Sequence, residues 1–427
     1  MRGILTFLAI AMTVLGAQAA PQTNDSITCH ITGIAGKHAG STLAILIEAE
    51  KDFRIHPVIP VPVTDGRYSY TLRDDMPRVY QVIFEDELSR GGWKDRFFAT
   101  GNGNVEIIGT DNDNDYYVDS IASDIPDNIT ANELSRIEKE TTQTVLSKFH
   151  ATLDSLDKCG KAYTPALQSL KEEYNAMEPC EKRDSLAMLM RSFFKGPKEQ
   201  CYTAEYLECE NKILDLYREM DASERAYLAA NPSLYGLFII KKAITYQSSW
   251  QDIPDYIRIF ETVYKDAMPA HPYTQEIEDL IKARAVKAGN KYPDYKLTRE
   301  DGTSEWILSL IKGNVAVIDL WASWCSPCRR HSVELIPLYE KYKDRGFKVV
   351  AVARESGNCD AMNEAMRKDG YPWESFVDLD DRGNVWRTNG ANNSGGRIIL
   401  VGADGVIVGT DLSTQEIADY LAKTYGE

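Results

Sequence analysis

The pattern of apolar and polar positions divides the chain into three segments. In the first, residues 21–118, short alternating runs such as STLAILIEA, RYSYTL and NVEIIG are separated by Gly, Asp and Pro. This pattern is typical of β-strands joined by turns. Prolines interrupt the run HPVIPVPV, and because proline cannot donate to a ladder, this run is expected at a sheet edge. We therefore predict a small all-β sandwich.

The second segment, residues 125–288, has apolar residues at helical spacing. It is rich in Leu, Ala, Glu, Lys and Tyr and contains few glycines. Asn231 followed by Pro232 predicts an N-cap and the first position of a helix, and His271 with Pro272 predicts the start of another. We expect a central α-helical block.

In the third segment, residues 289–427, strands and helices alternate. The apolar run VAVIDLWA predicts a buried strand, and the amphipathic run VELIPLYEKYKDRG predicts the helix after it. The runs FKVVAVA, ESFVDLD and RIILVGADGVIVGT follow, with a turn at Ala403-Asp404-Gly405, and TQEIADYLAKTYG predicts a final helix. This order predicts an α/β sheet with a terminal hairpin.

The N-terminus has the features of a cleaved export signal. Arg2 precedes an uncharged run from Ile4 to Gly16, and Ala17-Gln18-Ala19 supplies the small residues of a cleavage site. The run is shorter than the roughly 20 residues of a spanning helix, and no later segment is apolar enough to span. We expect a signal peptide at residues 1–20, a periplasmic location and no permanent membrane span.

Charge and length narrow the classes further. The 427 residues carry a formal net charge of -16, and no basic block is long enough to follow a phosphate backbone. Nucleic-acid binding is therefore not expected. A chain of this length exceeds one ordinary core, which agrees with several domains.

Eight cysteines follow the predicted signal, and an oxidising compartment permits disulfides among them. Only Cys325 and Cys328 have CxxC spacing, within VAVIDLWASWCSPCRRH. Among the others, Cys159 with Cys180 is the best candidate pair. The remaining cysteines are most simply small buried side chains.

The CxxC stretch carries the candidate chemistry. A strand that delivers Cys325 to the start of a helix places its sulfur at the positive end of the helix dipole, which favours the thiolate. Pro327 suits the first helical turn. We predict Cys325 as the exposed attacking thiol, Cys328 as the buried resolving thiol and Asp319, a carboxylate inside an apolar strand, as the base for Cys328. If strand alternation instead turns Asp319 to solvent, that role fails.

Two other uses of the pair are open at this point. A zinc site needs four ligands, but no second CxxC or tight His and Cys cluster accompanies the pair, and His331 alone is weak support. A structural disulfide would need neither a helix start nor a buried acid. Redox exchange without a metal or other cofactor is therefore the favoured interpretation.

The motif WASWCSPCRR, with YPDYKL and LIKGNVAVIDLW before it and ILVGADGVIV after it, resembles the TlpA-like and ResA-like thioredoxin-fold thiol-disulfide oxidoreductases. The resemblance covers roughly residues 289–427 and implies a thioredoxin-like fold there. The segments before it are similar to those of exported multidomain members with an N-terminal β-domain of unknown function. The implied activity is periplasmic disulfide reduction, with disulfide-containing exported proteins and an upstream membrane electron donor as partners.

Three positions depart from the family pattern. His331 and Val333 stand where members commonly carry glutamate and proline after the CxxC. Gly396 stands where the fold places a cis-proline against the cysteine pair. A non-proline cis peptide costs about 3 kcal/mol, so we expect a trans peptide before Gly396. Proline at this position is expected to raise turnover several-fold.

The resemblance also implies a substrate groove around the pair. Its expected lining residues are Trp324, Ser326, Pro327, Gly395 and Gly396. The loop after FKVVAVA brings Cys359 to the same sheet edge, so a third redox thiol is an open alternative. Because of Gly396, a second reading of the whole chain is a secreted binding module whose thioredoxin-like domain has low or lost turnover.

Overall fold

The computed structural model describes residues 26–108, 120–140, 144–393 and 395–426. The predicted signal peptide lies outside this part of the chain. Within it, no helix is both long enough and apolar enough to cross a membrane.

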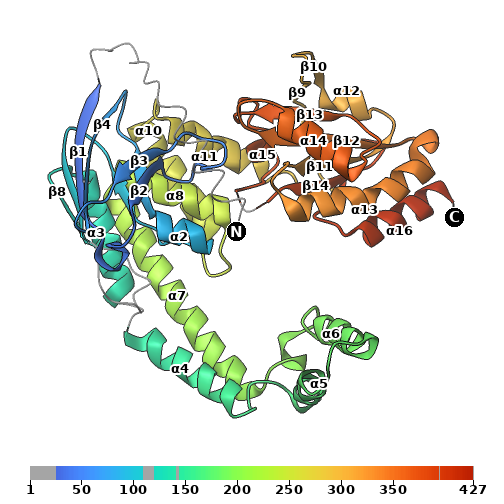
Figure 1. The fold of residues 1–427 in the computed structure, drawn as a ribbon, viewed down its shortest axis with the longest axis horizontal. Coiled ribbons are helices and arrows are strands. Elements are labelled where there is room, and N and C mark those ends of the chain that lie inside the picture. Colours follow the sequence, from blue (N-terminus) through green and yellow to red (C-terminus); the bar gives the residue numbers. More distant parts are fainter. Residues whose placement is uncertain (1–25, 109–119, 141–143, 394, 427) are drawn as a thin grey trace.

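The N-terminal region is rich in β-structure, as predicted, and holds two four-stranded sheets (Figure 1). The first has the order β4-β1-β7-β8 and the second β3-β2-β5-β6. The proline-rich run forms β3, at the edge of its sheet. The strands are β1 (Ile27–Ile34), β2 (Leu43–Glu48), β3 (Ile59–Pro62), β4 (Arg67–Asp74), β5 (Val79–Phe84), β6 (Phe97–Ala99), β7 (Gly103–Ile108) and β8 (Ser120–Ser123), and helix α2 (Glu85–Arg90) follows β5.

The central region is helical, which confirms the second prediction. Its helices are α3 (Asp127–Glu138), α4 (Thr144–Lys158), α5 (Pro165–Asn175), α6 (Glu181–Phe193), α7 (Ala204–Ala230), α8 (Leu234–Tyr246), α9 (Ile253–Ile259), α10 (Lys265–Ala267) and α11 (Pro272–Ala283). The predicted cap at Asn231 is wrong, because Asn231 ends α7 and Ser233 caps α8 by accepting the Gly236 N–H. His271 does cap α11, with Pro272 at its start.

The two sheets and several helices share one hydrophobic core, whose members run from Cys29 to Ile277. Phe97 of β6 packs edge-on against Phe238 of α8, with ring centroids 4.9 Å apart. The Tyr273 hydroxyl of α11 accepts the N–H of Val79, the first residue of β5, at 3.1 Å. Sheets and helices are therefore packed together as one body.

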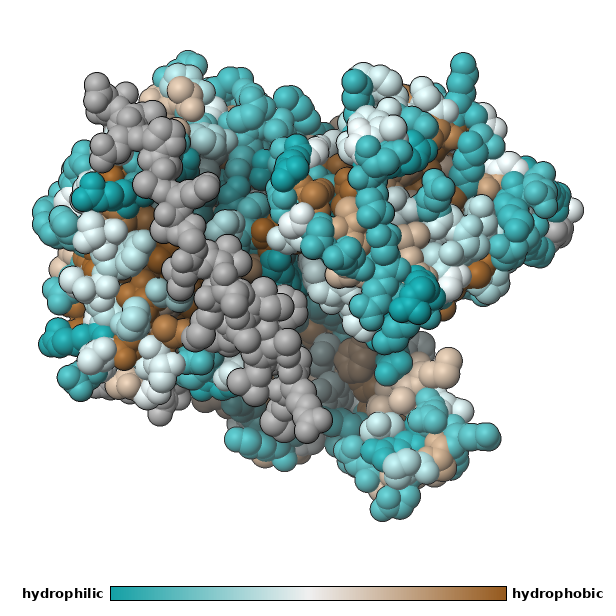
Figure 2. Space-filling model, turned by 45° about the horizontal axis from the view of Figure 1, so that its top comes forward, coloured by the Kyte–Doolittle hydropathy of each residue, from teal (hydrophilic) through white to brown (hydrophobic). Residues whose placement is uncertain are grey.

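Helices α4 and α7 form a long pair that extends away from this body and carries α5 and α6 at its far end (Figure 1). In the space-filling view this end projects as a separate lobe (Figure 2). Its cysteines include Cys159 and Cys180, which are both free and exposed. The predicted pairing of these two cysteines is therefore wrong.

The C-terminal region is an α/β fold with a five-stranded sheet of order β13-β12-β11-β14-β15. Strands β11, β12 and β13 are parallel, while β14 and β15 form the predicted antiparallel terminal hairpin. The sheet strands are β11 (Val315–Trp321), β12 (Phe347–Glu355), β13 (Ser375–Leu379), β14 (Arg397–Val401) and β15 (Ile407–Thr410), and a short hairpin holds β9 (Lys296–Thr298) and β10 (Ser304–Trp306). The helices are α12 (Ile307–Ile311), α13 (Ser326–Tyr342), α14 (Asp360–Asp369), α15 (Val385–Thr388) and α16 (Thr414–Tyr425).

Strand β11 lies at the centre of this sheet and is buried along its whole length. Ile318 and Leu320 belong to the core on one face, while Val317 and Trp321 belong to the core on the other. Because strand residues alternate between faces, Asp319 shares the face of Val317 and Trp321. Helix α13 covers that face, so this carboxylate does not reach solvent.

Candidate active site

The two cysteines lie where β11 leads into α13. Cys325 is the N-cap of α13, and its Sγ accepts the backbone N–H of Cys328 at 3.4 Å. Pro327 occupies the first turn, where its missing N–H leaves no helical bond unmade. Cys325 and Cys328 form a disulfide, with their Cα atoms 5.3 Å apart. The local sequence thus produces the predicted strand, cysteine and helix arrangement.

One cavity of about 460 Å³ brings all eight predicted site residues together. These residues are Asp319, Trp324, Cys325, Ser326, Pro327, Cys328, Gly395 and Gly396. The other lining residues include Arg54 from the N-terminal region and Arg397, Asp411 and Leu412 from in or beside the terminal hairpin. The sulfurs and the loop at Gly396 therefore face a common groove.

Cys325 is not the exposed thiol that the sequence led us to expect. Only 6% of Cys325 is exposed, whereas Cys328 is half-buried. Cys325 belongs to the hydrophobic core on one face of the sheet, together with Leu320 and Trp386. Arg54 and Trp324 line the groove with it.

Asp319 is 1% exposed and contacts α13 through Ser332. The Ser332 hydroxyl donates to Asp319 Oδ2 at 2.6 Å, while Oδ1 has no hydrogen-bond partner. Burial raises the pKa of Asp319 to about 7, and the bond from Ser332 offsets only part of that rise. Near neutral pH this carboxyl can both take up and release a proton.

Gly396 touches the pair from the opposite side. Its backbone N–H donates to Cys328 Sγ at 3.2 Å. A Cβ at this position would lie 1.8 Å from the Leu320 carbonyl oxygen and 3.1 Å from Cys328 Sγ. Among the described residues no peptide bond is cis, so the peptide before Gly396 is trans, as predicted. Glycine here permits a close backbone contact that a side chain would prevent.

One buried carboxylate and one arginine fix the loop that precedes Cys325. Glu355, at the end of β12, accepts the Ser323 N–H at 2.7 Å and the Ser323 hydroxyl at 2.8 Å. Arg329 donates to Asp369 at 2.6 and 2.8 Å and to the Ser323 carbonyl at 3.2 Å. These partners could not be predicted from local sequence patterns, because Glu355 and Asp369 lie far along the chain from Ser323 and Arg329.

Ser332 was not among the residues predicted from the sequence, although its helical spacing could have indicated it. It lies four residues after Cys328 and three before Leu335, a buried residue of the same helix. This spacing places Ser332 on the inner face of α13, where a hydroxyl needs a buried partner. The polar residue opposite it on β11 is Asp319.

The other candidates from the sequence stand as follows. His331 lines the groove, and both of its ring nitrogens are buried without a hydrogen-bond partner. Cys359 is free and buried at the start of α14, burial raises the pKa of its thiol, and it does not line the groove. In the described part of the chain, no three His, Cys, Asp or Glu side chains are grouped to hold a metal ion.

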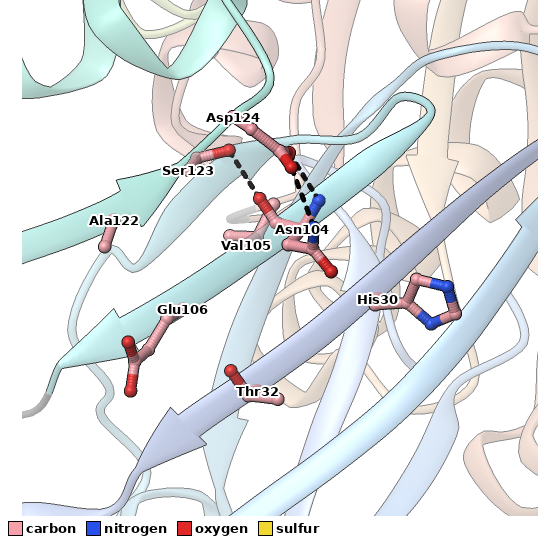
Figure 3. A pocket seen from close by; sticks show the side chains of 8 residues that line it. All are labelled: His30, Thr32, Asn104, Val105, Glu106, Ala122, Ser123 and Asp124. Atoms are coloured by element: carbon pink, nitrogen blue, oxygen red, sulfur yellow. Dashed lines mark hydrogen bonds between the residues drawn. The ribbon is translucent and has the colours of Figure 1, made fainter.

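A second hollow, of about 320 Å³, lies on the outer face of β1, β7 and β8 (Figure 3). Its polar groups are mostly paired with one another, since Asp124 accepts from the backbone and side-chain amides of Asn104, and Ser123 donates to the Asn104 carbonyl. It holds no cysteine and no pair of titratable groups aimed at a common point. We therefore place the chemistry in the groove at Cys325.

Comparison with known proteins agrees with this placement. Residues 287–422 match the family model described as Redoxin. Over 111 residues the chain is 24% identical to the thiol-disulfide oxidoreductase ResA of Bacillus thuringiensis subsp. konkukian, covering 26% of this chain and 62% of that protein. Over 80 residues it is 34% identical to ResA of Geobacillus kaustophilus, covering 19% and 45%. The chain thus spans less than two thirds of the length of these relatives.

Among solved structures, the chain is similar to the thioredoxin domain of a thiol-disulfide oxidoreductase from Bacteroides vulgatus, at 24% sequence identity. The match covers 32% of this chain and 96% of that chain, with a TM-score of 0.28. The family match covers the C-terminal region that holds the CxxC. Residues 287–422 thus match the Redoxin family and have a thioredoxin-like fold, and part of the chain is similar to the ResA thiol-disulfide oxidoreductases.

Proposed function

We propose that this protein is a periplasmic thiol-disulfide oxidoreductase that works as a reductase through Cys325 and Cys328. The observation that carries the proposal is a cysteine pair at a helix start beside a buried carboxyl whose pKa is raised to about 7. Cys325 at the N-cap is stabilised as a thiolate by the helix N-terminus. Its substrates are disulfides in exported proteins or small molecules.

The reaction is an exchange of two electrons. The Cys325 thiolate attacks one sulfur of the substrate disulfide, forms a mixed disulfide and releases the first substrate thiolate. Cys328 passes its proton to Asp319, attacks the Cys325 sulfur and releases the second thiolate. The Cys325–Cys328 disulfide is restored, and the substrate is reduced. A dithiol donor at the membrane then returns two electrons and two protons to the pair.

The direct test is single turnover with the pair reduced beforehand. We expect the wild-type pair to reach a redox equilibrium with glutathione and to reduce insulin. Cys325→Ser should abolish insulin reduction, while Cys328→Ser should retain substrate as a stable mixed disulfide. Cys359→Ser, a buried cysteine outside the groove, should behave like wild type. A pair that never equilibrates with glutathione would rule out this function.

One observation favours a second candidate. Cys325 is almost fully buried, as expected of a secreted binding module whose redox domain has little turnover. This alternative predicts that the pair stays oxidised in the presence of excess reduced glutathione. It also predicts that Cys325→Ser leaves binding of the partner unchanged.

A further inference from the structure

The loop between β2 and β3, residues 49–58, reaches from the N-terminal region to the C-terminal α/β region, residues 287–422. We name the loop the β2–β3 loop and the α/β region the redox domain. Arg54 Nη2 donates to the Asn393 carbonyl at 3.0 Å, and Asn393 Nδ2 donates back to the Glu50 carbonyl at 2.8 Å. Ser356 donates to the Ile55 carbonyl at 3.2 Å. Backbone and side-chain bonds from both sides therefore fix this loop against the groove.

A network of charges reinforces the contact. Asp52, with 2% of its side chain exposed, accepts from Arg54 Nε and Nη2 at 2.8 and 2.7 Å. Arg354 of β12 lies 3.6 Å from the same carboxylate and also pairs with Asp381. His56 Nε2 reaches Asp381 at 3.0 Å. Because two arginines face two aspartates, the buried charges are balanced, which makes the arrangement stable in one geometry.

Arg54 stacks on the residue that precedes the cysteine pair. Its guanidinium lies 3.5 Å from the ring centroid of Trp324, the residue immediately before Cys325. A cation at this distance is attracted to the ring face. With Asp52 on one side and Trp324 on the other, the Arg54 side chain is held in a single position as part of the groove lining.

The dimensions of the groove restrict what can enter. Cys325 is 6% exposed, and the groove between Arg54 and the loop at Gly395 and Gly396 encloses about 460 Å³. A volume of this size suits a small molecule or one extended strand of polypeptide. A disulfide held inside a folded domain carries a wide surface around it, which the β2–β3 loop would meet before the sulfurs touched.

We propose that the β2–β3 loop is the substrate-selecting wall of this enzyme and that Arg54 is its specificity-determining residue. The wall favours disulfides on small molecules and extended chains, so that disulfides within folded proteins react with Cys325 more slowly. The proposal rests on the proposed redox function. The exchange itself is unchanged, with two electrons passing from the pair to the substrate disulfide.

The test measures second-order rate constants for oxidation of the reduced full-length protein by glutathione disulfide and by native insulin. The quantity of interest is the ratio of the insulin rate to the glutathione rate. We expect Arg54→Ala to raise this ratio about tenfold, because the wall is shortened. Arg54→Met keeps the bulk without the charge and should stay near the wild-type ratio. Arg90→Ala removes an exposed arginine of the same region that pairs with Asp86, and it should match wild type.

If Arg54→Ala kept the wild-type ratio of the insulin rate to the glutathione rate, the proposal would be overturned. Equal ratios in Arg54→Met and Arg54→Ala would overturn it as well, because charge and not bulk would then control access. A failure of the redox function would look different, since the wild-type protein would then react with neither disulfide.

Discussion

At the scale of single residues, Asp319 combines a stability cost with the proton-acceptor role that we propose for it. Its neighbours on β11 are apolar, and α13 covers it, so the charged form loses its hydration. Only Ser332 compensates with a hydrogen bond. The carboxyl is therefore neutral over a pH range in which an exposed aspartate is ionised, and it can serve as the proton acceptor that Cys328 needs.

The raised pKa of Asp319 predicts how stability depends on pH. The folded protein binds this proton up to about pH 7, while the unfolded chain releases it near 3.8. Between these values the unfolded state binds fewer protons, so the free energy of unfolding falls as pH rises, by up to about 4 kcal/mol. Asp319→Asn removes this loss. Urea unfolding should show the variant more stable at pH 8 and no different at pH 3.5; equal stability at pH 8 would contradict the assignment.

The same residue predicts a pH profile for turnover. Resolution of the mixed disulfide should accelerate through an inflection near pH 7, as Asp319 ionises and becomes a base. Asp319→Asn should lose the inflection and slow resolution about 100-fold. Ser332→Ala keeps the base but removes the bond that lowers its pKa, so its inflection should move above pH 7. Stopped-flow kinetics of the reduced protein would measure the rate of resolution and the pH of its inflection. An unshifted inflection in Ser332→Ala would argue against proton transfer from Cys328 to Asp319.

At the scale of elements, the β11–α13 junction and the start of β14 meet at the sulfurs. The junction supplies the helix N-terminus, and the segment before β14 supplies the Gly396 N–H to Cys328. Proline at position 396 would lack this donor and would carry the Cβ that meets the Leu320 carbonyl. On this backbone, proline at position 396 is therefore expected to slow turnover, the opposite of what the family resemblance implied.

Substitution at Gly396 should therefore damage both packing and rate. We expect Gly396→Ala to destabilise the fold by about 1–3 kcal/mol, because its Cβ must displace backbone. Gly396→Pro should slow insulin reduction several-fold. Gly395→Ala is the matched control, since nothing lies within 4 Å of its added Cβ. Denaturant unfolding measures the stability of each variant, and the insulin assay measures its rate. Faster insulin reduction by Gly396→Pro than by the wild type would show that the Gly396 N–H is dispensable.

Local pattern predicted these elements well, because a strand, a CxxC and an amphipathic helix are adjacent in the chain. Cys325 and Pro327 could be placed at the groove from a short motif, and Gly396 from the family resemblance. The stacking of Arg54 on Trp324 could not be predicted in this way, since Arg54 belongs to a different region. No periodicity relates an arginine in a β-turn segment to a tryptophan 270 positions later.

At the scale of the whole molecule, α11 connects the shared core to the redox domain. Its Glu276 meets Lys51 of the β2–β3 loop at 3.3 Å, Lys241 of α8 at 3.0 Å and Arg387 of α15 at 3.3 Å. Although burial opposes ionisation, these three cations lower the pKa of Glu276 to about 2. One carboxylate therefore joins three parts of the chain. The three parts could be predicted from the sequence, but the Glu276 ion-pair cluster that connects them could not.

Loss of this carboxylate should loosen the assembly. Because the folded pKa of Glu276 is depressed, its stabilisation is present above about pH 4.5 and is lost as pH falls towards 2, about 3 kcal/mol in all. Glu276→Gln should lower the free energy of unfolding by a similar amount at pH 7 and leave no difference at pH 2. Glu278→Gln, on the same helix but paired only with exposed Lys265, should change little. Equal losses of unfolding free energy in Glu276→Gln and Glu278→Gln would contradict this role of Glu276.

The shared core also sets an order of assembly. Its residues run to Ile277, so a chain that folds as it is made cannot close the first body until α11 has emerged. The redox domain, residues 287–422, comes only after that point. The first body can therefore fold before Cys325 and Cys328 are synthesised, but the β2–β3 loop reaches its final position only when the redox domain supplies Asn393 and Ser356 as partners.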